Sequence, residues 1–97
     1  MLGFRLKVLR EAKGLLQREV AAKLEVDTAY ISKVENDEKR LSKAHLSMLS
    51  KILEVNEKEL HNLWLADKVL SVIDEEDEAE KAIEIVHEYI KQIKNKC

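Results

Sequence analysis

Few side chains in this sequence have the type and spacing that catalysis or metal binding requires. The three histidines, His45, His61 and His87, have no Cys, Asp or His partner at metal-ligand spacing. No serine or cysteine lies in a nucleophile motif, and no glycine-rich phosphate loop is present. The carboxylates from Asp74 to Glu80 are typical of a solvated run, not of a catalytic pair. The sequence therefore predicts a protein that is not an enzyme and that holds neither a metal nor a cofactor.

The chemistry that remains is electrostatic, because charge is distributed unevenly along the chain. Residues 1–51 contain 11 Lys or Arg and 7 Asp or Glu, whereas residues 52–97 contain 6 and 12. A basic first half suits a polyanionic partner, and an acidic second half suggests a separate task. This charge distribution fits ordinary solvated helix surfaces at least as well as it fits a polyanionic partner, so charge alone does not indicate a function.

Length and composition favour one small all-α unit. The 97 residues include 45% hydrophobic residues, no proline and two glycines, and Leu, Glu, Lys and Ala dominate. This balance argues against a sandwich or a barrel. The single cysteine, Cys97, excludes a disulfide within one chain and fits a reducing compartment. Without a signal peptide or a membrane-spanning stretch, we expect a cytoplasmic protein with no membrane partner.

Apolar spacing and capping residues divide the chain into six expected helices. Gly14 ends the first, Asp27 caps the third with its carboxylate, and polar residues 36–40 form a loop. Asn56 opens the fifth helix, and the acidic run near residue 74 ends it. The expected helices cover residues 2–13, 17–24 and 28–36, then one capped by Ser42, one after Asn56, and a sixth ending near residue 94.

The second and third expected helices have the pattern of a helix-turn-helix. Two short helices that cross steeply must share a core, and a small residue is needed where they touch. Ala21 is that small residue, and the three residues 25–27 form the turn. The free face of the second helix could then enter the major groove of DNA. The shared core would consist of Val20, Leu24, Val26, Ile31 and Val34.

Residues 14–21 (GLLQREVA) and 30–36 (YISKVEN), with the Leu-Arg rhythm of residues 6–10, resemble the lambda-repressor-like, or XRE-family, DNA-binding domain. The resemblance covers roughly residues 2–65. It implies a five-helix lambda-repressor-like domain that binds double-stranded operator DNA, usually as a symmetric dimer. We therefore expect a helix-turn-helix DNA-binding domain over residues 1–66 and a C-terminal helical dimerisation extension over residues 67–97.

Three residues depart from the pattern of that family. Glycine is usual where Glu25 stands, so a left-handed backbone there would cost about 1 kcal/mol. Serine or threonine often caps the helix where Leu16 lies, which predicts a poorly capped second helix. Glycine is also common at Asp37, whose charge would weaken DNA binding unless it points away from phosphate.

The resemblance places the start of the third helix against base edges. Lys33 is the best reader of guanine, because its ammonium can reach N7 and O6. Thr28 can donate or accept a hydrogen bond, and Ala29 can contact a thymine methyl group. Tyr30 could equally pack on the first motif helix or stack on a sugar. The expected base-reading residues are Thr28, Ala29, Tyr30, Ser32 and Lys33.

Phosphate contacts would position this reader without specifying sequence. The resemblance gives that role to Gln17 and Asn36, and the other candidates are basic residues near them. The resemblance also pairs Arg10 with Glu35, as an orienting strut with an additional phosphate contact from Arg10. The expected phosphate-binding residues are Gln17, Arg18, Asn36, Lys39, Arg40 and Lys43.

The last third of the chain has more apolar surface than one intramolecular stripe requires. One stripe per helix could close a core within the chain, but the sixth helix carries a second set, Ile85 and Tyr89. We therefore expect a two-fold dimer interface there. An alternative is a surface that binds another protein, such as a toxin. The expected interface residues are Trp64, Leu70, Ile73, Ile83, Val86, Tyr89, Ile90 and Ile93.

The sequence is thus interpreted as a homodimeric transcriptional regulator that binds a palindromic operator through the recognition helix at residues 28–36. We expect a repressor or autoregulator of a nearby promoter. Proteins of this build include phage repressors, controllers of restriction–modification operons and antitoxins, and the compact two-helix tail favours a controller or a stand-alone repressor. The alternative is an antitoxin-like or other protein-interaction module whose acidic second half binds a partner.

Overall fold

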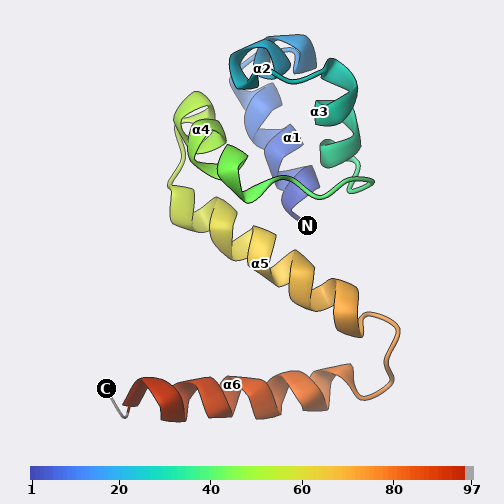
Figure 1. Ribbon diagram of the computed structural model, residues 1–97, viewed down its shortest axis with the longest axis vertical. Coiled ribbons are helices and arrows are strands. Elements are labelled where there is room, and N and C mark those ends of the chain that lie inside the picture. Colours follow the sequence, from blue (N-terminus) through green and yellow to red (C-terminus); the bar gives the residue numbers. More distant parts are fainter. Residues whose placement is uncertain (96–97) are drawn as a thin grey trace.

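The computed structural model describes residues 1–95, and its regular structure in that range is entirely helical, as predicted. The first four helices form a head, from which α5 extends, and α6 lies beneath α5 at an angle to it (Figure 1). The predicted bounds of the first three helices agree with the structure to within one residue. The helices are α1 (Leu2–Ala12), α2 (Gln17–Leu24), α3 (Thr28–Glu35), α4 (Lys43–Leu53), α5 (Glu57–Ile73) and α6 (Ala79–Asn95).

Short polar side chains begin two of these helices as expected. Ser42 Oγ accepts a hydrogen bond from the Ala44 amide at 3.3 Å, and Asn56 Oδ1 accepts one from the Lys58 amide at 2.8 Å. Asp27 does occupy the N-cap of α3, but its carboxylate makes no capping hydrogen bond, so that part of the prediction was wrong. The eight residues of α3 therefore depend on tertiary contacts for their helical conformation.

The N-terminus of α2 is only half capped, as the leucine at its cap position predicts. Leu16 has no side-chain oxygen to offer to the free amides of the first turn. Glu19 compensates in part, because its Oε1 accepts a hydrogen bond from the Leu16 amide at 2.9 Å.

One hydrophobic core holds the head together and includes the first half of α5. Five of the six predicted motif positions are buried in it, with Ala21 at the contact between α2 and α3, and Val26 packs at its edge. The core residues are Leu2, Leu6, Val20, Ala21, Leu24, Ile31, Val34, Leu41, Leu46, Leu49, Leu53, Leu60 and Trp64.

Trp64 belongs to this core, which corrects its assignment to an exposed dimer interface. Its side chain is 8% exposed, and its Nε1 donates a hydrogen bond to the Leu41 carbonyl oxygen at 2.7 Å. The Lys68 ammonium lies 4.1 Å from the ring centroid. A large indole with a polar edge is stable in a core only when its N–H finds an acceptor. The loop before α4 supplies that acceptor, so Trp64 fastens α5 to the head.

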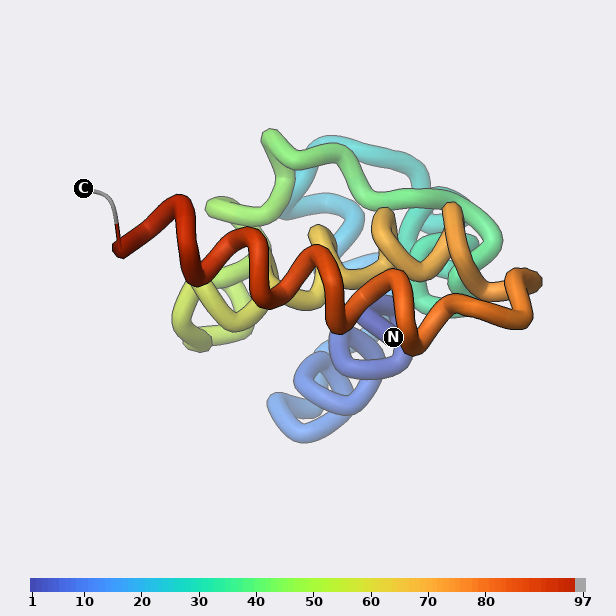
Figure 2. Tube along the Cα trace, turned by 90° about the horizontal axis from the view of Figure 1, so that it is seen from below, coloured from blue at the N-terminus to red at the C-terminus, as the bar shows by residue number. Residues whose placement is uncertain are grey.

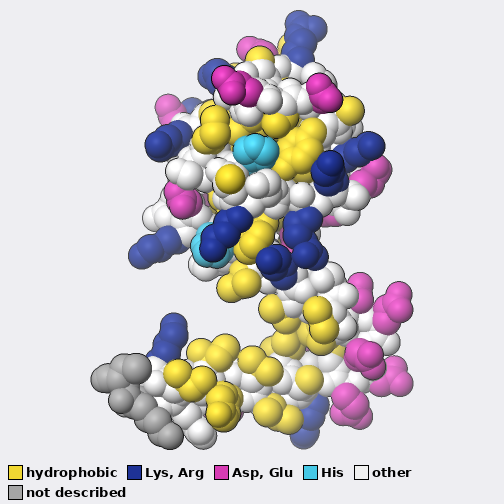
Figure 3. All heavy atoms as spheres, viewed as in Figure 1, with side chains coloured by type: hydrophobic (Ala, Val, Ile, Leu, Met, Phe, Trp, Pro, Cys, Tyr) yellow, Lys and Arg dark blue, Asp and Glu magenta, His cyan; other side chains and the backbone are white. Residues whose placement is uncertain are grey.

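The chain beyond Trp64 makes an arm whose apolar residues face solvent. None of the described residues of α6 is buried, and Ile85 and Tyr89 are 66% and 64% exposed. Viewed from below, α6 crosses the molecule as a separate rod (Figure 2). Hydrophobic side chains follow α6 and the facing part of α5, with acidic side chains at the turn between them (Figure 3). An amphipathic helix of this length is marginal in water without a partner for its apolar face.

The left-handed backbone anticipated at Glu25 is present. Glu25 has a φ of 59°, and it ends α2 in the conformation that glycine adopts most readily. Asp37 has the same φ of 59°, and Gly14 ends the first helix at a φ of 71°. A side chain in this region places its Cβ close to the following carbonyl oxygen, so Glu25 and Asp37 each destabilise the head.

We expect Glu25→Gly to raise the free energy of unfolding by about 1 kcal/mol, because glycine relieves this strain. For a domain of this size that corresponds to a rise of about 4–8 °C in the thermal midpoint. Thermal unfolding followed by circular dichroism measures it. Gly14→Ala is the matched control, since a Cβ there meets no atom within 4 Å and adds only backbone strain. It should lower the midpoint, and an unchanged or lower midpoint for Glu25→Gly would contradict the argument.

Candidate nucleic-acid interface

The recognition helix α3 has one buried face and one accessible face. Ile31, Val34 and Glu35 are buried against the head. The accessible face spans about 12 Å, the length of eight helical residues. Four of the five predicted base-reading residues lie on it: Thr28, Ala29 and Lys33 are exposed, and Ser32 is half-buried. The structure thus brings together residues that could reach base edges.

The fifth predicted reader, Tyr30, is half-buried, packs against the core and contacts α4. Its hydroxyl oxygen accepts a hydrogen bond from the Ser42 amide at 3.1 Å and lies 3.2 Å from His45 Nδ1. The two rings meet edge to face at 5.6 Å, and the Lys39 ammonium lies 5.3 Å from the tyrosine ring. Tyr30 therefore fixes the distance between α3 and the start of α4. Sequence reasoning missed His45, whose place in the first turn after Ser42 was the available signal.

A buried ion pair fixes the end of α3 on the two preceding helices. Arg10 and Glu35 are 8% and 7% exposed, and the guanidinium donates to the carboxylate twice, Nε to Oε2 at 2.6 Å and Nη2 to Oε1 at 3.0 Å. Gln17 Nε2 also donates to Glu35 Oε1 at 3.0 Å. The hydrogen bond to Glu35 raises the pKa of Arg10 above its usual value, against the opposing effect of burial. The predicted pairing of Arg10 with Glu35 is therefore present in the structure.

The Arg10 guanidinium is also bonded beyond Glu35, although the sequence suggested an additional phosphate contact for it. Its third nitrogen, Nη1, donates to the Leu15 carbonyl oxygen at 2.7 Å, so all three nitrogens bond within the head. Gln17, half-buried, uses one of its two amide protons on Glu35 and keeps the other.

Exposed polar and basic side chains border the accessible face of α3. Arg18 lies in the first turn of α2, Asn36 and Lys39 follow α3, and Lys43 begins α4. All four are exposed. They come from the segments on either side of the recognition helix in sequence, which is where phosphate contacts would flank a reader in the major groove.

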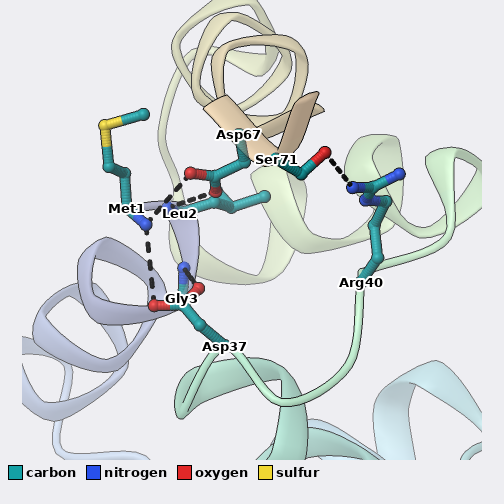
Figure 4. A network of polar contacts seen from close by, with 7 residues as sticks. All are labelled: Met1, Leu2, Gly3, Asp37, Arg40, Asp67 and Ser71. Carbon is teal, nitrogen blue, oxygen red and sulfur yellow. Dashed lines mark hydrogen bonds and ion pairs between the residues drawn. The ribbon is translucent and has the colours of Figure 1, made fainter. Parts of the chain in front are cut away.

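Arg40 stands apart from these residues. Its Nη2 donates to Ser71 Oγ on α5 at 3.2 Å, so the guanidinium is directed toward the arm (Figure 4). Its neighbour in sequence, Lys39, contacts Tyr30 instead. The structure does not group Arg40 with the other predicted phosphate-binding residues.

Asp37 is directed away from the accessible face of α3. Its Oδ1 accepts a hydrogen bond from the Gly3 amide at 3.2 Å, and its Oδ2 lies 3.5 Å from the Met1 ammonium (Figure 4). Asp67 on α5 accepts from the Leu2 amide at 2.9 Å and from the same ammonium at 3.1 Å. Burial lowers the pKa of that ammonium, but the hydrogen bond to Asp67 and the two negative charges raise it overall. Asp37 thus joins α1 to the segment that follows α3.

Other kinds of site are not formed by the residues that the structure describes. Within residues 1–95, no group of three or more His, Cys, Asp or Glu could hold a metal ion. No helix in the same range has the length and apolar character needed to cross a membrane.

Comparison with known families identifies the family to which this chain belongs. A helix-turn-helix family model, HTH_3, matches residues 6–60, more than half of the chain. The chain belongs to the XRE-type helix-turn-helix family. It is a DNA-binding transcriptional regulator, as its sequence predicted, and its family consists of regulators and not of enzymes.

Solved structures of XRE-type regulators share this fold. The restriction–modification controller protein C.AhdI from Aeromonas hydrophila is 34% identical, with a TM-score of 0.57, over 61% of this chain and 89% of that one. The biofilm regulator SinR, solved in complex with DNA, is 33% identical, with a TM-score of 0.57, over 62% of this chain and 97% of its own. A SinR–SinI complex is 24% identical, with a TM-score of 0.55, over 98% of this chain and 99% of that chain. No curated protein sequence matches the chain.

Removing one partner of the buried pair tests its part in holding α3. We expect Arg10→Met to lower the free energy of unfolding by about 3 kcal/mol or more, because the Glu35 carboxylate would remain buried without its cation. The double variant Arg10→Met/Glu35→Leu should be more stable than Arg10→Met, since it strands no charge. Urea unfolding of the unaltered protein, of Arg10→Met, of Glu35→Leu and of the double variant measures the difference. A double variant that loses the sum of the two single effects would contradict this account.

Proposed function

We propose that this regulator binds a palindromic operator as a homodimer and represses or autoregulates a nearby promoter. The observation that supports this best is the accessible face of α3, whose opposite face is fixed by Glu35 and by the core. In a two-fold dimer the recognition helices, residues 28–36, would occupy successive major grooves about 34 Å apart. The solved relatives support it: one is described as a controller protein and another was solved with DNA.

Base reading would come from the exposed first turns of α3. Lys33 would donate to the N7 and O6 acceptors of guanine, and Thr28 and Ser32 could each donate or accept. Ala29 would lie against a thymine methyl group. Tyr30 would act by holding α3 against α4, because its hydroxyl is already bonded to the Ser42 amide.

Phosphate contacts would come from the side chains that border this face. Arg18, Lys39 and Lys43 carry positive charge, and Asn36 and the remaining amide proton of Gln17 can donate. Each cation that displaces a counterion makes binding more dependent on salt. Arg40, which bonds to Ser71, is left out of this proposed set.

The proposed dimer interface lies in residues 67–97, beyond the proposed DNA-binding domain at residues 1–66. The core ends at Trp64, and the apolar residues that follow lie largely on the surface although α5 is continuous across the boundary. A single short domain contacts too few phosphates for tight specific binding, so a second head is needed. With Trp64 excluded, the proposed interface residues are Leu70, Ile73, Ile83, Val86, Tyr89, Ile90 and Ile93.

A second candidate is an antitoxin-like protein-interaction module. The exposed apolar face of α6 and the 12 acidic residues of residues 52–97 favour it, since a basic partner could be neutralised there. A partner that co-purifies in equal amount, together with a monomeric chain in its absence, would support this function over the homodimer.

Two lysines of the proposed interface should differ in their effects. Lys33→Ala should weaken binding to the preferred operator by about tenfold and relax its sequence preference, because a base contact is lost. Lys43→Ala should weaken all DNA alike and reduce the salt dependence of binding by about one phosphate contact. Gel shifts with the upstream region of the protein's own gene and with unrelated DNA, at several salt concentrations, measure both.

Lys51→Ala is the matched control, because Lys51 is an exposed lysine at the opposite end of α4 from Lys43. It should leave binding unchanged. Identical effects of Lys33→Ala and Lys43→Ala would contradict the assigned roles. Absence of binding by the unaltered protein even at low salt would overturn the proposed DNA contact.

A further inference from the structure

The apolar residues of α6 recur with the spacing of an antiparallel or parallel helix pair. Ile83, Val86, Ile90 and Ile93 are separated by three, four and three residues, which are the a and d positions of a heptad. Their side chains are among the exposed large hydrophobic residues of the chain. A seam of this kind fits the equivalent face of another helix and is narrower than a stripe that faces a domain core.

The charges of α6 are arranged so that the helix complements itself only in one orientation. Beside the seam, Glu80 lies near the N-terminal end of the helix, after the acidic run 74–78, and Lys94 lies near its C-terminal end. Lys81, Glu84, Glu88 and Lys91 occupy outward b and f positions. Two parallel copies would place Glu80 beside the acidic run of the second copy. Two antiparallel copies place each acidic end against a basic end. Opposite charges at the edges of a helix seam select the orientation of the pair.

We propose that α6 pairs antiparallel with α6 of a second copy of this chain, in a register that sets Ile83 against Ile93 and Val86 against Ile90. This inference rests on the proposed homodimer and specifies its interface. In an antiparallel pair, a positions of one helix meet d positions of the other. Ile83 and Ile90 are a positions, and Val86 and Ile93 are d positions, so both contacts follow this rule. The two-fold axis repeats each contact.

The same register pairs the flanking residues. Glu80, His87 and Lys94 occupy successive e positions, seven residues apart. In the antiparallel pair Glu80 lies beside Lys94 of the second copy, and the two-fold axis repeats this contact. His87 lies beside His87 of the second copy near the axis. Hydrophobic layers and charge pairs therefore agree on one register, although they involve different residues.

The second copy also accounts for the apolar residues outside the seam. Ile85 and Tyr89 adjoin the a and d stripe on the side away from Glu80, so α6 needs a second neighbour there. The C-terminal half of α5 offers Leu65, Val69 and Val72, which are exposed. Two arms, each made of α5 and α6, together form a four-helix assembly. In this assembly α6 of the second copy covers the a and d stripe, and α5 covers the side with Ile85 and Tyr89.

Charge reversal tests the orientation. In the full chain, Glu80→Lys and Lys94→Glu should each weaken the dimer about tenfold at low salt, because two symmetry-related pairs become repulsive. The double variant Glu80→Lys/Lys94→Glu should recover the original dissociation constant to within about threefold. Sedimentation equilibrium measures it. Lys81→Glu is the matched control, since Lys81 occupies an outward f position and should have no effect.

A parallel pair would give the opposite result for one variant. Glu80 would then lie near the acidic run of the second copy, so Glu80→Lys would tighten the dimer. That outcome, or a double variant no better than the single ones, overturns the proposed register while leaving the homodimer intact. A chain that sediments as a monomer overturns the homodimer of the proposed function as well.

Site-directed cross-linking gives a second measurement that needs no weakened variant. In a Cys97→Ser background, His87→Cys should be joined to its own copy by a short bismaleimide, because residue 87 lies near the two-fold axis. Glu80→Cys alone should not be joined, but it should cross-link to Lys94→Cys when the two proteins are mixed. Efficient self-cross-linking of Glu80→Cys would overturn the antiparallel arrangement.

Discussion

The buried bonds between Glu35 and its two donors determine where the recognition helix points. Glu35 ends α3, and its carboxylate accepts from Arg10 on α1 and Gln17 on α2. A helix of eight residues has little stability of its own, so its direction is set by what its buried face contacts. Charge-assisted bonds of fixed geometry define that direction more narrowly than apolar packing, which tolerates rotation. If Glu35 moved to another position on α3, the helix would have to rotate, and Lys33 would leave the accessible face.

Two further contacts hold α3 at its other sides. Tyr30 joins it to the start of α4, and Asp37 joins the loop after it to the amide of Gly3 on α1. Gly3 is required there, because a Cβ would overlap the carbonyl oxygens of Val34 and Glu35. The left-handed backbone of Asp37 costs stability, but it turns the chain so that the carboxylate reaches α1. The face with Thr28 and Lys33 is the side that these contacts leave accessible.

The sequence predicted the features that depend on residues close together in the chain. The motif core from Val20 to Val34 follows from helical periodicity, and the resemblance, through the glycine that is usual at Glu25, indicated the left-handed conformation there. What the sequence did not indicate are partners that are distant in the chain: Trp64 bonds to Leu41, and Arg40 to Ser71. Periodicity indicates that Trp64 lies on an apolar face, but it cannot tell whether the same chain or another covers that face. The resemblance supplied the Arg10–Glu35 pair. It did not indicate that all three Arg10 nitrogens donate hydrogen bonds within the chain.

In the proposed dimer, association of the arms would strengthen DNA binding by the heads. The core closes at Trp64, so the described residues of α6 contribute no buried surface to the head. Their apolar side chains are stabilised only when another helix removes them from water, at about 25 cal/mol for each Å² covered. Once two arms associate, the second head reaches its half-site as part of the same complex, at a high effective concentration. In the proposed dimer, the few base and phosphate contacts of one short α3 would then be sufficient, because the apolar surface of the arm would supply the free energy that joins the two heads.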